Sequence, residues 1–300
     1  MSISRARLRE LVGLDEPALA LASCDSEIGD DYTIERLRFR MGRDDVRGLL
    51  TRPKHSAGQH PAILYAHAHG ARYDIGAGEL LDGRDALVDP LGPALARAGY
   101  VTLAIDMPTF GERATIREGA AAKALLWHGR SLFGQMLSEQ AAALTYLASR
   151  PDVDATRIGA FGISMGCTLS YWLAAMDLRI AAVAHLCCFA DFRTLIALGN
   201  HDLHGIYLTV PGLLAEADAG AIASLIAPRP QLICVGDADP LTPPAAVDRA
   251  LSELEPAYAG HPGKLSVIRE AEVGHQETRR MREATLAFFS ANLGSAHPSA

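Results

Sequence analysis

The stretch RIGAFGISMGCTLSYWLAAM (157–176) decides the fold, because a short apolar run leads into the pentapeptide GISMG and an apolar helical stretch follows it. The pentapeptide matches G-x-S-x-G in the strand–turn–helix setting that a nucleophile elbow requires. We expect a strained backbone at Ser164, with the flanking glycines keeping Cβ atoms out of a tight strand–helix contact. Its hydroxyl would project at a helix N-terminus, where the helix dipole favours developing negative charge. The alternative is a serine that merely caps the helix of an ordinary α/β protein.

Other short, nearly continuous apolar runs accompany this strand. They are AILYAHA (62–68), YVTLAID (100–106), IAAVAHL (180–186), QLICVG (231–236) and, less apolar, KLSVIRE (264–270). Such runs are typical of parallel strands that helices cover on both faces. Helical segments separate them, at about 85–98, 130–149, 165–176, 243–254 and 277–292. Strands that alternate with helices imply right-handed crossovers and a doubly wound, mostly parallel sheet of the α/β class.

Three segments fall outside this alternation. Residues 1–30 predict a helical N-terminal lead-in, and the runs TIERLRFR (33–40) and VRGLLTR (46–52) resemble an edge hairpin. Residues 189–228 are too long for a simple crossover. We expect short helices there, in a cap-like insertion over the carboxyl edge of the sheet, where open α/β sheets bind ligands; the alternative is a longer packing excursion. We expect residues 31–294 to form a single domain that includes this insertion.

A serine hydroxyl needs a general base, and position along the chain points to His275 among eleven histidines. It lies in EAEVGHQETRR, between the last expected strand and the last expected helix. The aspartate that orients this base should follow QLICVG, where VGDADPLTPP offers Asp237 and Asp239. The spacing Gly-x-x-Asp-x-x-x-Pro favours Asp239, which leaves Asp237 as a turn residue. The order Ser, Asp, His along the chain is one that catalytic triads are known to use.

An acyl-transfer site also needs N–H donors for an oxyanion. One should be the backbone N–H of Met165, directly after the serine. The other should come from the HAHG loop, where we favour the N–H of His69 over those of Ala68 and Gly70. The H-x-H pattern of His67 and His69 could instead bind a metal. No acidic cluster follows at ligand spacing, so we expect no metal site.

The insertion carries most of the residues that we expect to line a substrate pocket. An apolar wall with a few polar groups suits an ester of modest size. The expected lining residues are Phe189, Phe192, His201, His204 and Tyr207 from the insertion, with His67 from the HAHG loop. His201 and His204 could alternatively bind a metal, although we favour a polar pocket lining or a turn. In the turn IDMPTFGER beside the site, we favour a structural ion pair of Asp106 with Arg113 over contact with substrate.

Composition and charge exclude several classes of protein. The net charge is −7, and no run of basic residues could neutralise nucleic-acid phosphates. No apolar stretch is long enough to predict a membrane span, and the N-terminus lacks the apolar core of a signal peptide. Five cysteines without a C-x-x-C pair fit reduced thiols better than disulfides. We expect a cytoplasmic protein that binds a small-molecule ester and neither nucleic acid nor membrane, with an oligomeric state that these residues do not specify.

Over residues 45–293 the chain resembles the dienelactone-hydrolase-like and acetyl-xylan-esterase-like α/β hydrolases. The resemblance rests on RIGAFGISMG, the HAHG loop, IDMPTFGER, the IAPRP run before QLICVGDADPLTPP, and the GH before the final helix. It implies an α/β-hydrolase fold and hydrolysis of carboxylic esters through an acyl-enzyme, without a cofactor. Dienelactone hydrolases proper use a cysteine nucleophile where this chain has Ser164. Cys167 also stands where many relatives have glycine, and packing explains this thiol better than chemistry does.

Other functions are open to the same residues. A peptidase could use this triad, but the sequence contains no propeller domain to select peptides, and an acyltransferase would replace water by an alcohol or amine. A non-catalytic scaffold that only binds a ligand usually lacks a member of the triad, whereas all three residues are present here. We favour a serine esterase with two-step acyl transfer, in which His275 takes the proton of Ser164 and Asp239 orients the imidazole.

Overall fold

The computed structural model describes residues 3–54 and 58–294 and contains a nine-stranded sheet in the order β1-β2-β3-β5-β4-β6-β7-β8-β9. The strands are β1 (Leu19–Ile28), β2 (Tyr32–Met41), β3 (Asp44–Pro53), β4 (His60–Ala66), β5 (Val101–Ile105), β6 (Val153–Ile163), β7 (Ile180–Leu186), β8 (Gln231–Gly236) and β9 (Leu265–Glu270). The pairs β1–β2, β2–β3 and β3–β5 are antiparallel, and the five other pairs are parallel. Each apolar run forms a strand, so the expected doubly wound, mostly parallel sheet is confirmed.

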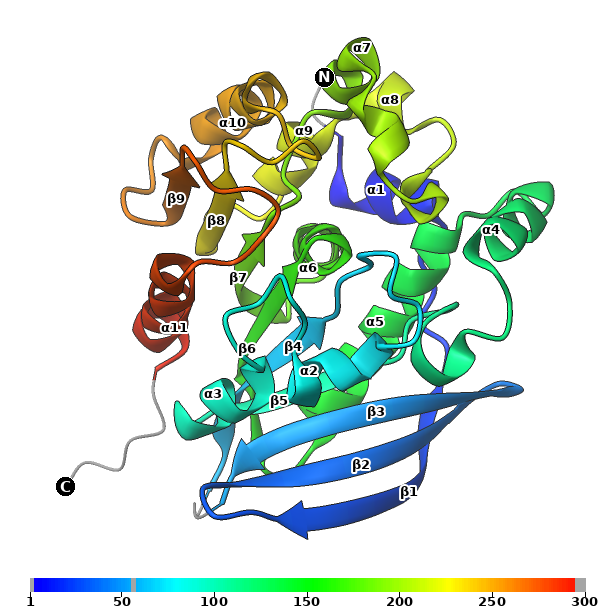
Figure 1. Cartoon of the computed structure of the whole chain (residues 1–300), viewed down its shortest axis with the longest axis vertical. Coiled ribbons are helices and arrows are strands. Elements are labelled where there is room, and N and C mark those ends of the chain that lie inside the picture. The colour runs from blue at the N-terminus through cyan, green and yellow to red at the C-terminus, as the bar shows by residue number, and fades with distance from the viewer. Residues whose placement is uncertain (1–2, 55–57, 295–300) are drawn as a thin grey trace.

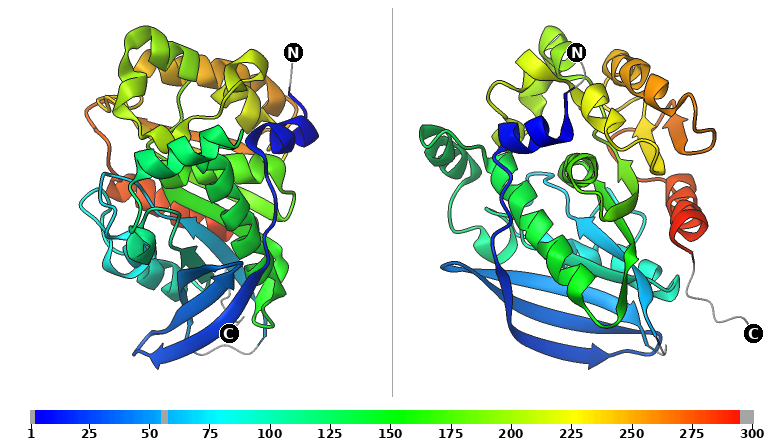
Figure 2. Two further views of the ribbon diagram at one scale, coloured as in Figure 1. Left: turned by 90° about the vertical axis from the view of Figure 1, so that its right-hand side faces the viewer. Right: turned by 180° about the vertical axis from the view of Figure 1, so that it is seen from behind.

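Helices cover both faces of this sheet (Figure 2). They are α1 (Arg5–Val12), α2 (Glu79–Asp82), α3 (Leu91–Arg97), α4 (Glu118–Trp127), α5 (Leu132–Ser149), α6 (Met165–Met176), α7 (Phe192–Leu198), α8 (Leu213–Glu216), α9 (Ala219–Ser224), α10 (Pro244–Tyr258) and α11 (Arg279–Leu293), with 3-10 turns η1 (Gly76–Gly78), η2 (Gly111–Arg113), η3 (Asn200–Leu203) and η4 (Ile206–Leu208). Side chains of α5 and α6 belong to one apolar core, and those of α3 and α11 to a second core on the other face. The helix expected at 85–98 begins only at Leu91, because Pro90 before it is extended. Helix α4 was not predicted.

The N-terminal segment corrects the expectation of a helical lead-in over residues 1–30. Among its described residues, helix is confined to α1, and the chain then forms β1, whose side chains are almost all exposed. Strand β1 pairs with β2 along its length, so backbone hydrogen bonds rather than an apolar face hold it in place. Because β1 covers β2, the predicted hairpin of β2 and β3 lies inside the sheet and not at its edge (Figure 1).

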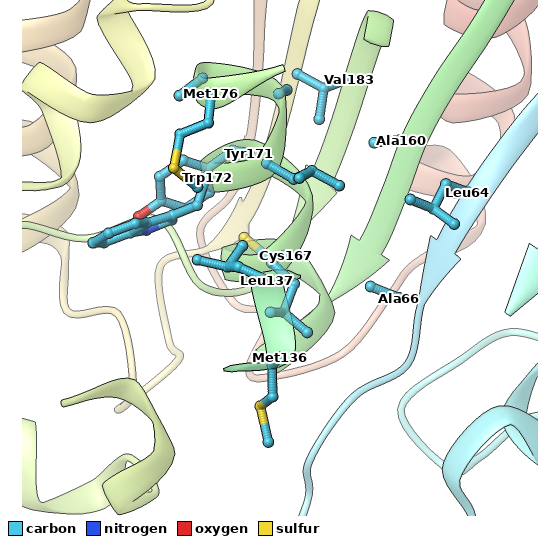
Figure 3. Close-up of a cluster of buried hydrophobic side chains, with 14 of the residues drawn as sticks. Leu64, Ala66, Met136, Leu137, Ala160, Cys167, Tyr171, Trp172, Met176 and Val183 are labelled. Carbon is cyan, nitrogen blue, oxygen red and sulfur yellow. The ribbon is translucent and has the colours of Figure 1, made fainter. Parts of the chain in front are cut away.

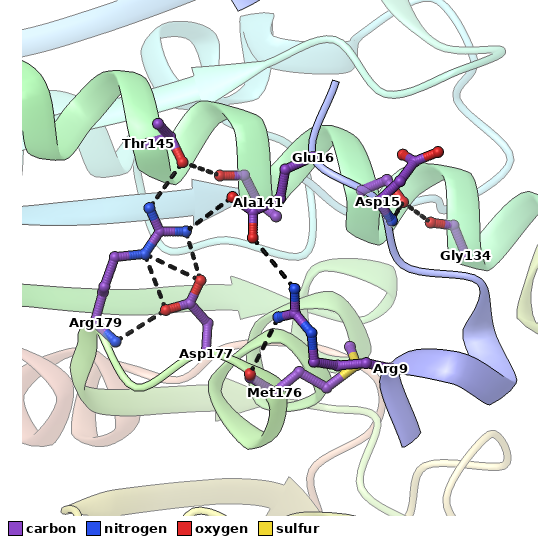
Figure 4. Close-up of polar contacts among 10 residues, drawn as sticks. Arg9, Asp15, Glu16, Gly134, Ala141, Thr145, Met176, Asp177 and Arg179 are labelled. Carbon is purple, nitrogen blue, oxygen red and sulfur yellow. Dashed lines mark hydrogen bonds and ion pairs between the residues drawn. The ribbon is translucent and has the colours of Figure 1, made fainter. Parts of the chain in front are cut away.

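Polar contacts fasten α1 and the chain after it to the helical layer (Figure 4). Arg9 donates a hydrogen bond to the carbonyl of Met176 at 3.4 Å and pairs with Glu16 at 3.3 Å. Arg179 pairs with Asp177 at 2.6 Å and reaches Glu16 at 3.7 Å. The lead-in is therefore docked against the C-terminal end of α6, although most of these ion pairs are partly exposed and each contributes little to stability.

Helix α6, which follows the elbow, is buried along its whole length. Figure 3 shows its side chains packed among those of α5 and the sheet. The ring of Trp172 meets Phe133 edge-on with centroids 5.0 Å apart. Cys167 is fully buried, and this burial raises the pKa of its thiol well above the usual value. The thiol is thus a packing group, and the helix that carries the elbow is held rigidly.

The strand order reverses beside β4, because β5 lies on one side of it and β6 on the other. Open α/β sheets bind ligands outside the carboxyl ends of their strands at such a point. Ala66 of β4 pairs with Gly162 of β6, so the HAHG loop and the elbow leave the sheet side by side. The topology therefore brings together two motifs that lie about 100 residues apart in the sequence.

The insertion at 189–228 consists of short helices, as expected. Helices α7 and α8 lie at the top of Figure 1, at the opposite end of the molecule from β1 to β3. Helix α9, in contrast, packs against α6 and α10, and most of its residues are buried. Residues from both parts of the insertion, among them Tyr207, Leu213 and Ile222, belong to the main apolar core.

The five cysteines form no disulfide: Cys24 is exposed and the other four are buried. Within residues 3–54 and 58–294, none of the helices has the length and apolar character needed to cross a bilayer.

Candidate active site

The turn at Ser164 has the strained geometry that the sequence predicts. Its φ of 59° and ψ of −118° are rare for a residue with a side chain. A Cβ atom at Gly162 would lie 2.4 Å from the backbone of Gly166, and one at Gly166 would lie 1.9 Å from the carbonyl oxygen of Ala66. Both glycines are therefore required by the close approach of α6 to β4 and β6. The Ser164 N–H donates to the carbonyl of Leu186 at 2.9 Å, which ties the turn to β7.

His275 and Asp239 are in direct contact. The Nδ1 atom of His275 lies 2.6 Å from Oδ2 of Asp239, a carboxylate that is almost fully buried. The same carboxylate accepts hydrogen bonds from the backbone N–H of Leu241 at 2.8 Å and the hydroxyl of Thr242 at 3.1 Å. A carboxylate can only accept a hydrogen bond, so Nδ1 of His275 carries the proton that it donates to Asp239. Nε2 is then left without a proton as the basic atom. Asp237 instead pairs with Arg269 at 2.6 Å, away from the histidine.

Ser164 and His275 line one cavity of about 710 Å³. Its wall comes from the HAHG loop, the start of α4, and residues 203–207 of the insertion. The structure describes both side chains and shows no hydrogen bond between them. Contacts of this kind are often long before substrate binds and shorten in the reactive complex. The cavity therefore gives a ligand access to both the serine hydroxyl and the imidazole.

The backbone N–H groups near Ser164 fall into two classes. The N–H of Met165 lies in the first turn of α6, where helical N–H groups lack an intrahelical partner. The N–H of Ala68 is already used, because it donates to both carboxylate oxygens of Glu79 at 3.1 and 3.2 Å. In the described part of the chain, the N–H groups of His69 and Gly70 donate no hydrogen bond, and both residues line the cavity. Two of the three candidates in the HAHG loop therefore remain.

His67 does not line the cavity, contrary to expectation. It is fully buried: its Nδ1 donates to the carbonyl of Ala68 at 3.0 Å, and its Nε2 accepts from the N–H of Met107 at 3.2 Å. Burial lowers the pKa of His67 to about 4, so the ring is neutral near pH 7. The ring therefore joins the loop after β4 to the loop after β5 and leaves no nitrogen for a metal.

The expected pocket residues of the insertion divide among three environments. His204 and Tyr207 line the cavity of Ser164. Phe192 and His201 line a second cavity of about 530 Å³, whose wall is mostly apolar and shares residues 204–206 with the first. Phe189 lines neither, because its ring packs into the core against Tyr171 and His185 with centroids 5.7 and 5.6 Å away. Burial also lowers the pKa of His204, whose Nε2 donates to the carbonyl of Leu241 at 2.9 Å.

Asp106 has a structural role, but with a partner different from the expected one. Its buried carboxylate pairs with Arg47 at 2.9 Å and accepts the N–H groups of Ala77 at 2.7 Å and Glu112 at 2.9 Å. At Asp106, Arg113 donates a hydrogen bond only to the backbone carbonyl, at 3.1 Å, and it forms an ion pair with Glu139. The expected ion pair between Asp106 and Arg113 is therefore wrong.

Four polar residues of the cavity wall were not expected from the sequence, namely Tyr73, Thr109, Arg117 and Glu118. Glu118 is buried and opens α4. Its only signal in the sequence is an acidic residue at the start of a helical stretch, which by itself predicts no function. Among the described residues, no group of three or more His, Cys, Asp or Glu side chains is arranged to hold a metal ion.

Comparison with known proteins gives consistent matches. The model of the dienelactone hydrolase family matches residues 84–261. The protein YtaP of Bacillus subtilis (strain 168), whose name describes it as a hydrolase, is 37% identical over 291 residues, which cover 95% of this chain and 97% of YtaP. The acetyl xylan esterase from Paenibacillus sp. R4 has a TM-score of 0.68 at 19% identity, with 96% of this chain and 93% of that chain covered. Acetyl xylan esterase 1 from Thermoanaerobacterium sp. JW/SL YS485 has a TM-score of 0.66 at 19% identity, with 95% and 91% covered. These two likenesses identify the α/β-hydrolase fold.

Proposed function

Because the chain belongs to the dienelactone hydrolase family and is a carboxylic ester hydrolase, we propose that it works by two-step acyl transfer through Ser164, His275 and Asp239. Nε2 of His275 removes the hydroxyl proton as Ser164 attacks the ester carbonyl. The tetrahedral intermediate collapses when His275 returns this proton to the leaving alcohol. Water then attacks the acyl-enzyme, with His275 again as the base, and releases the acid and the free serine.

The observation that carries this proposal is the 2.6 Å contact of His275 Nδ1 with buried Asp239, together with the cavity that His275 shares with Ser164 at its strained turn. The carboxylate fixes the tautomer in which Nε2 is basic and stabilises the imidazolium that forms during attack. The N–H groups of Met165 and His69 would donate hydrogen bonds to the developing oxyanion. The test is labelling of Ser164 by a fluorophosphonate, combined with hydrolysis of a panel of p-nitrophenyl and natural esters.

The cavity that the insertion lines supports an ester of modest size as substrate. Residues 204–206 form a strip that borders both the cavity of Ser164 and the second, mostly apolar cavity. An acyl chain that extends from the ester carbonyl past this strip would bury apolar surface, and this burial would favour binding by about 25 cal/mol for each Å² buried. We therefore propose that the strip limits the length of acyl chain that the enzyme prefers.

Substitution of Ile206 by alanine tests this limit. Ile206 lines both cavities and is 43% exposed, so the shorter side chain should open the strip without unfolding the protein. We expect the ratio of kcat/KM for hexanoyl over acetyl esters to rise about tenfold, the effect of one or two methylene contacts. Leu198→Ala is the matched control, since Leu198 is 53% exposed and lines neither cavity. A change of less than about threefold in Ile206→Ala would mean that the strip does not select chain length.

Activity should survive EDTA and exhaustive dialysis. The proposed mechanism draws its base, its nucleophile and its oxyanion donors from protein groups and needs no Lewis acid. The measurement is ester hydrolysis before and after chelation. Loss of activity that a single divalent metal restores would contradict the mechanism and point to His201 and His204 as ligands, since both ring nitrogens of His67 and of His69 are already hydrogen-bonded.

A further inference from the structure

Glu118 gathers three donors from three separate parts of the chain. Its Oε2 lies 2.7 Å from Nε2 of His69 and accepts the hydroxyl proton of Tyr73 at 2.7 Å. Its Oε1 accepts the backbone N–H of Tyr207 at 2.8 Å. Burial would raise the pKa of this carboxyl, but these hydrogen bonds outweigh it and leave the pKa below the usual value. A buried carboxylate is thus kept ionised by donors from the HAHG loop, the chain after it and the insertion.

The ring of His69 has little freedom in this arrangement. Its Nδ1 accepts the N–H of Ala71 at 3.0 Å, so Nε2 carries the proton that Glu118 accepts. Rings of Tyr73, Phe110 and Tyr207 surround it, with centroids 5.2, 5.1 and 5.4 Å away.

Gly205 of the insertion closes the remaining side. A Cβ atom there would come 2.8 Å from Oε1 of Glu118 and 2.9 Å from Nε2 of His69. The insertion therefore packs directly against the hydrogen bond between these two residues. A side chain held by contacts on these sides also fixes the backbone that carries it, and the N–H of His69 belongs to that backbone.

We propose, building on the acyl-transfer function proposed above, that Glu118 is a positioning residue which holds the His69 ring and thereby aims the His69 N–H at the oxyanion. Glu118 touches no reacting atom in this role. Because Tyr207 and Gly205 meet the same carboxylate, the insertion helps to complete the oxyanion site, in addition to lining the cavity. The effect belongs to the transition state, where the carbonyl oxygen becomes an anion.

The test compares Glu118→Gln, His69→Ala and the double variant, with rates expressed per active site titrated by fluorophosphonate. An amide cannot accept all three donors, so we expect Glu118→Gln to lower kcat about 10- to 100-fold and to change KM less than about threefold. Affinity for a trifluoromethyl ketone, which forms an oxyanion on Ser164, should fall by the same factor. In the His69→Ala background, adding Glu118→Gln should lower kcat by less than about a further threefold. Both substitutions remove the same interaction, so their effects should not add.

Conservative and remote variants separate positioning from a general loss of structure. Glu118→Asp keeps the charge and should lose less activity than Glu118→Gln, and it carries the same test if the amide variant does not fold. Glu35→Gln removes another buried carboxylate, which pairs with Arg52 and Arg150 away from the cavity, and should lower the unfolding temperature but not kcat.

Two results would overturn the positioning role: kcat within about threefold of wild type in Glu118→Gln, or full additivity with His69→Ala. A wild-type protein that hydrolyses no ester and takes no fluorophosphonate label would instead overturn the proposed function itself, and the positioning role with it.

Discussion

Replacement of Ser164 by alanine should lower kcat by about 10⁶-fold, the loss expected when a nucleophile that acts as a unit with its base is removed. KM should change little, since the hydroxyl contributes to bond formation rather than to binding of the ester. The strained turn should persist, because Gly162 and Gly166 rather than the hydroxyl permit the close approach of α6 to the sheet. The measurement is steady-state hydrolysis of a p-nitrophenyl ester by freshly purified variant.

Ser170→Ala is a suitable control for this substitution. Ser170 is also on α6 and buried, but it does not line the cavity. It should keep kcat close to that of wild type and retain fluorophosphonate labelling, whereas Ser164→Ala should lose the label. If Ser164→Ala retains more than about 1% of the activity after contaminating enzymes are excluded, the serine mechanism is wrong.

Asp239→Asn should be the second most damaging substitution, with a loss in kcat of about 10⁴-fold. An asparagine side chain can donate to Nδ1 of His275, which favours the tautomer with its proton on Nε2 and so removes the base. The buried site also loses the negative charge that stabilises the imidazolium during attack. Steady-state kinetics at pH 7 to 8, with circular dichroism to verify folding, measures this effect.

Asp237→Asn provides the matched comparison, because Asp237 lies two residues away and pairs with Arg269. This ion pair is partly exposed, so its loss should cost less than about tenfold in kcat and little in stability. The opposite ranking of the two variants would show that the contact between Asp239 and His275 does not orient the base.

The sequence alone predicted the parts of the fold whose signals are local. Continuous apolar runs predicted the strands β4 to β8, and GISMG predicted the strained turn at Ser164. Both signals lie within a few consecutive residues, since a buried strand is an apolar run and a tight turn needs glycines beside it. The strand β1 was missed, since its apolar residues, most of them in its first half, form no buried face, and its stability comes from pairing with β2. The helix α4 was missed for a similar reason: it has an almost uniform composition with no clear apolar face.

Only the tertiary structure decided which polar groups meet. Spacing favoured Asp239 over Asp237, but contact with His275, 36 residues away, distinguishes them in space. Glu118 binds partners 49, 45 and 89 residues distant, so no local pattern could indicate its role. Phe189 and His67 follow strands at the expected site and were therefore predicted to line the pocket. In the structure both rings are buried in the interior. Local backbone preference and apolar periodicity are encoded in short stretches, whereas hydrogen bonds among buried polar groups depend on which distant segments the fold brings together.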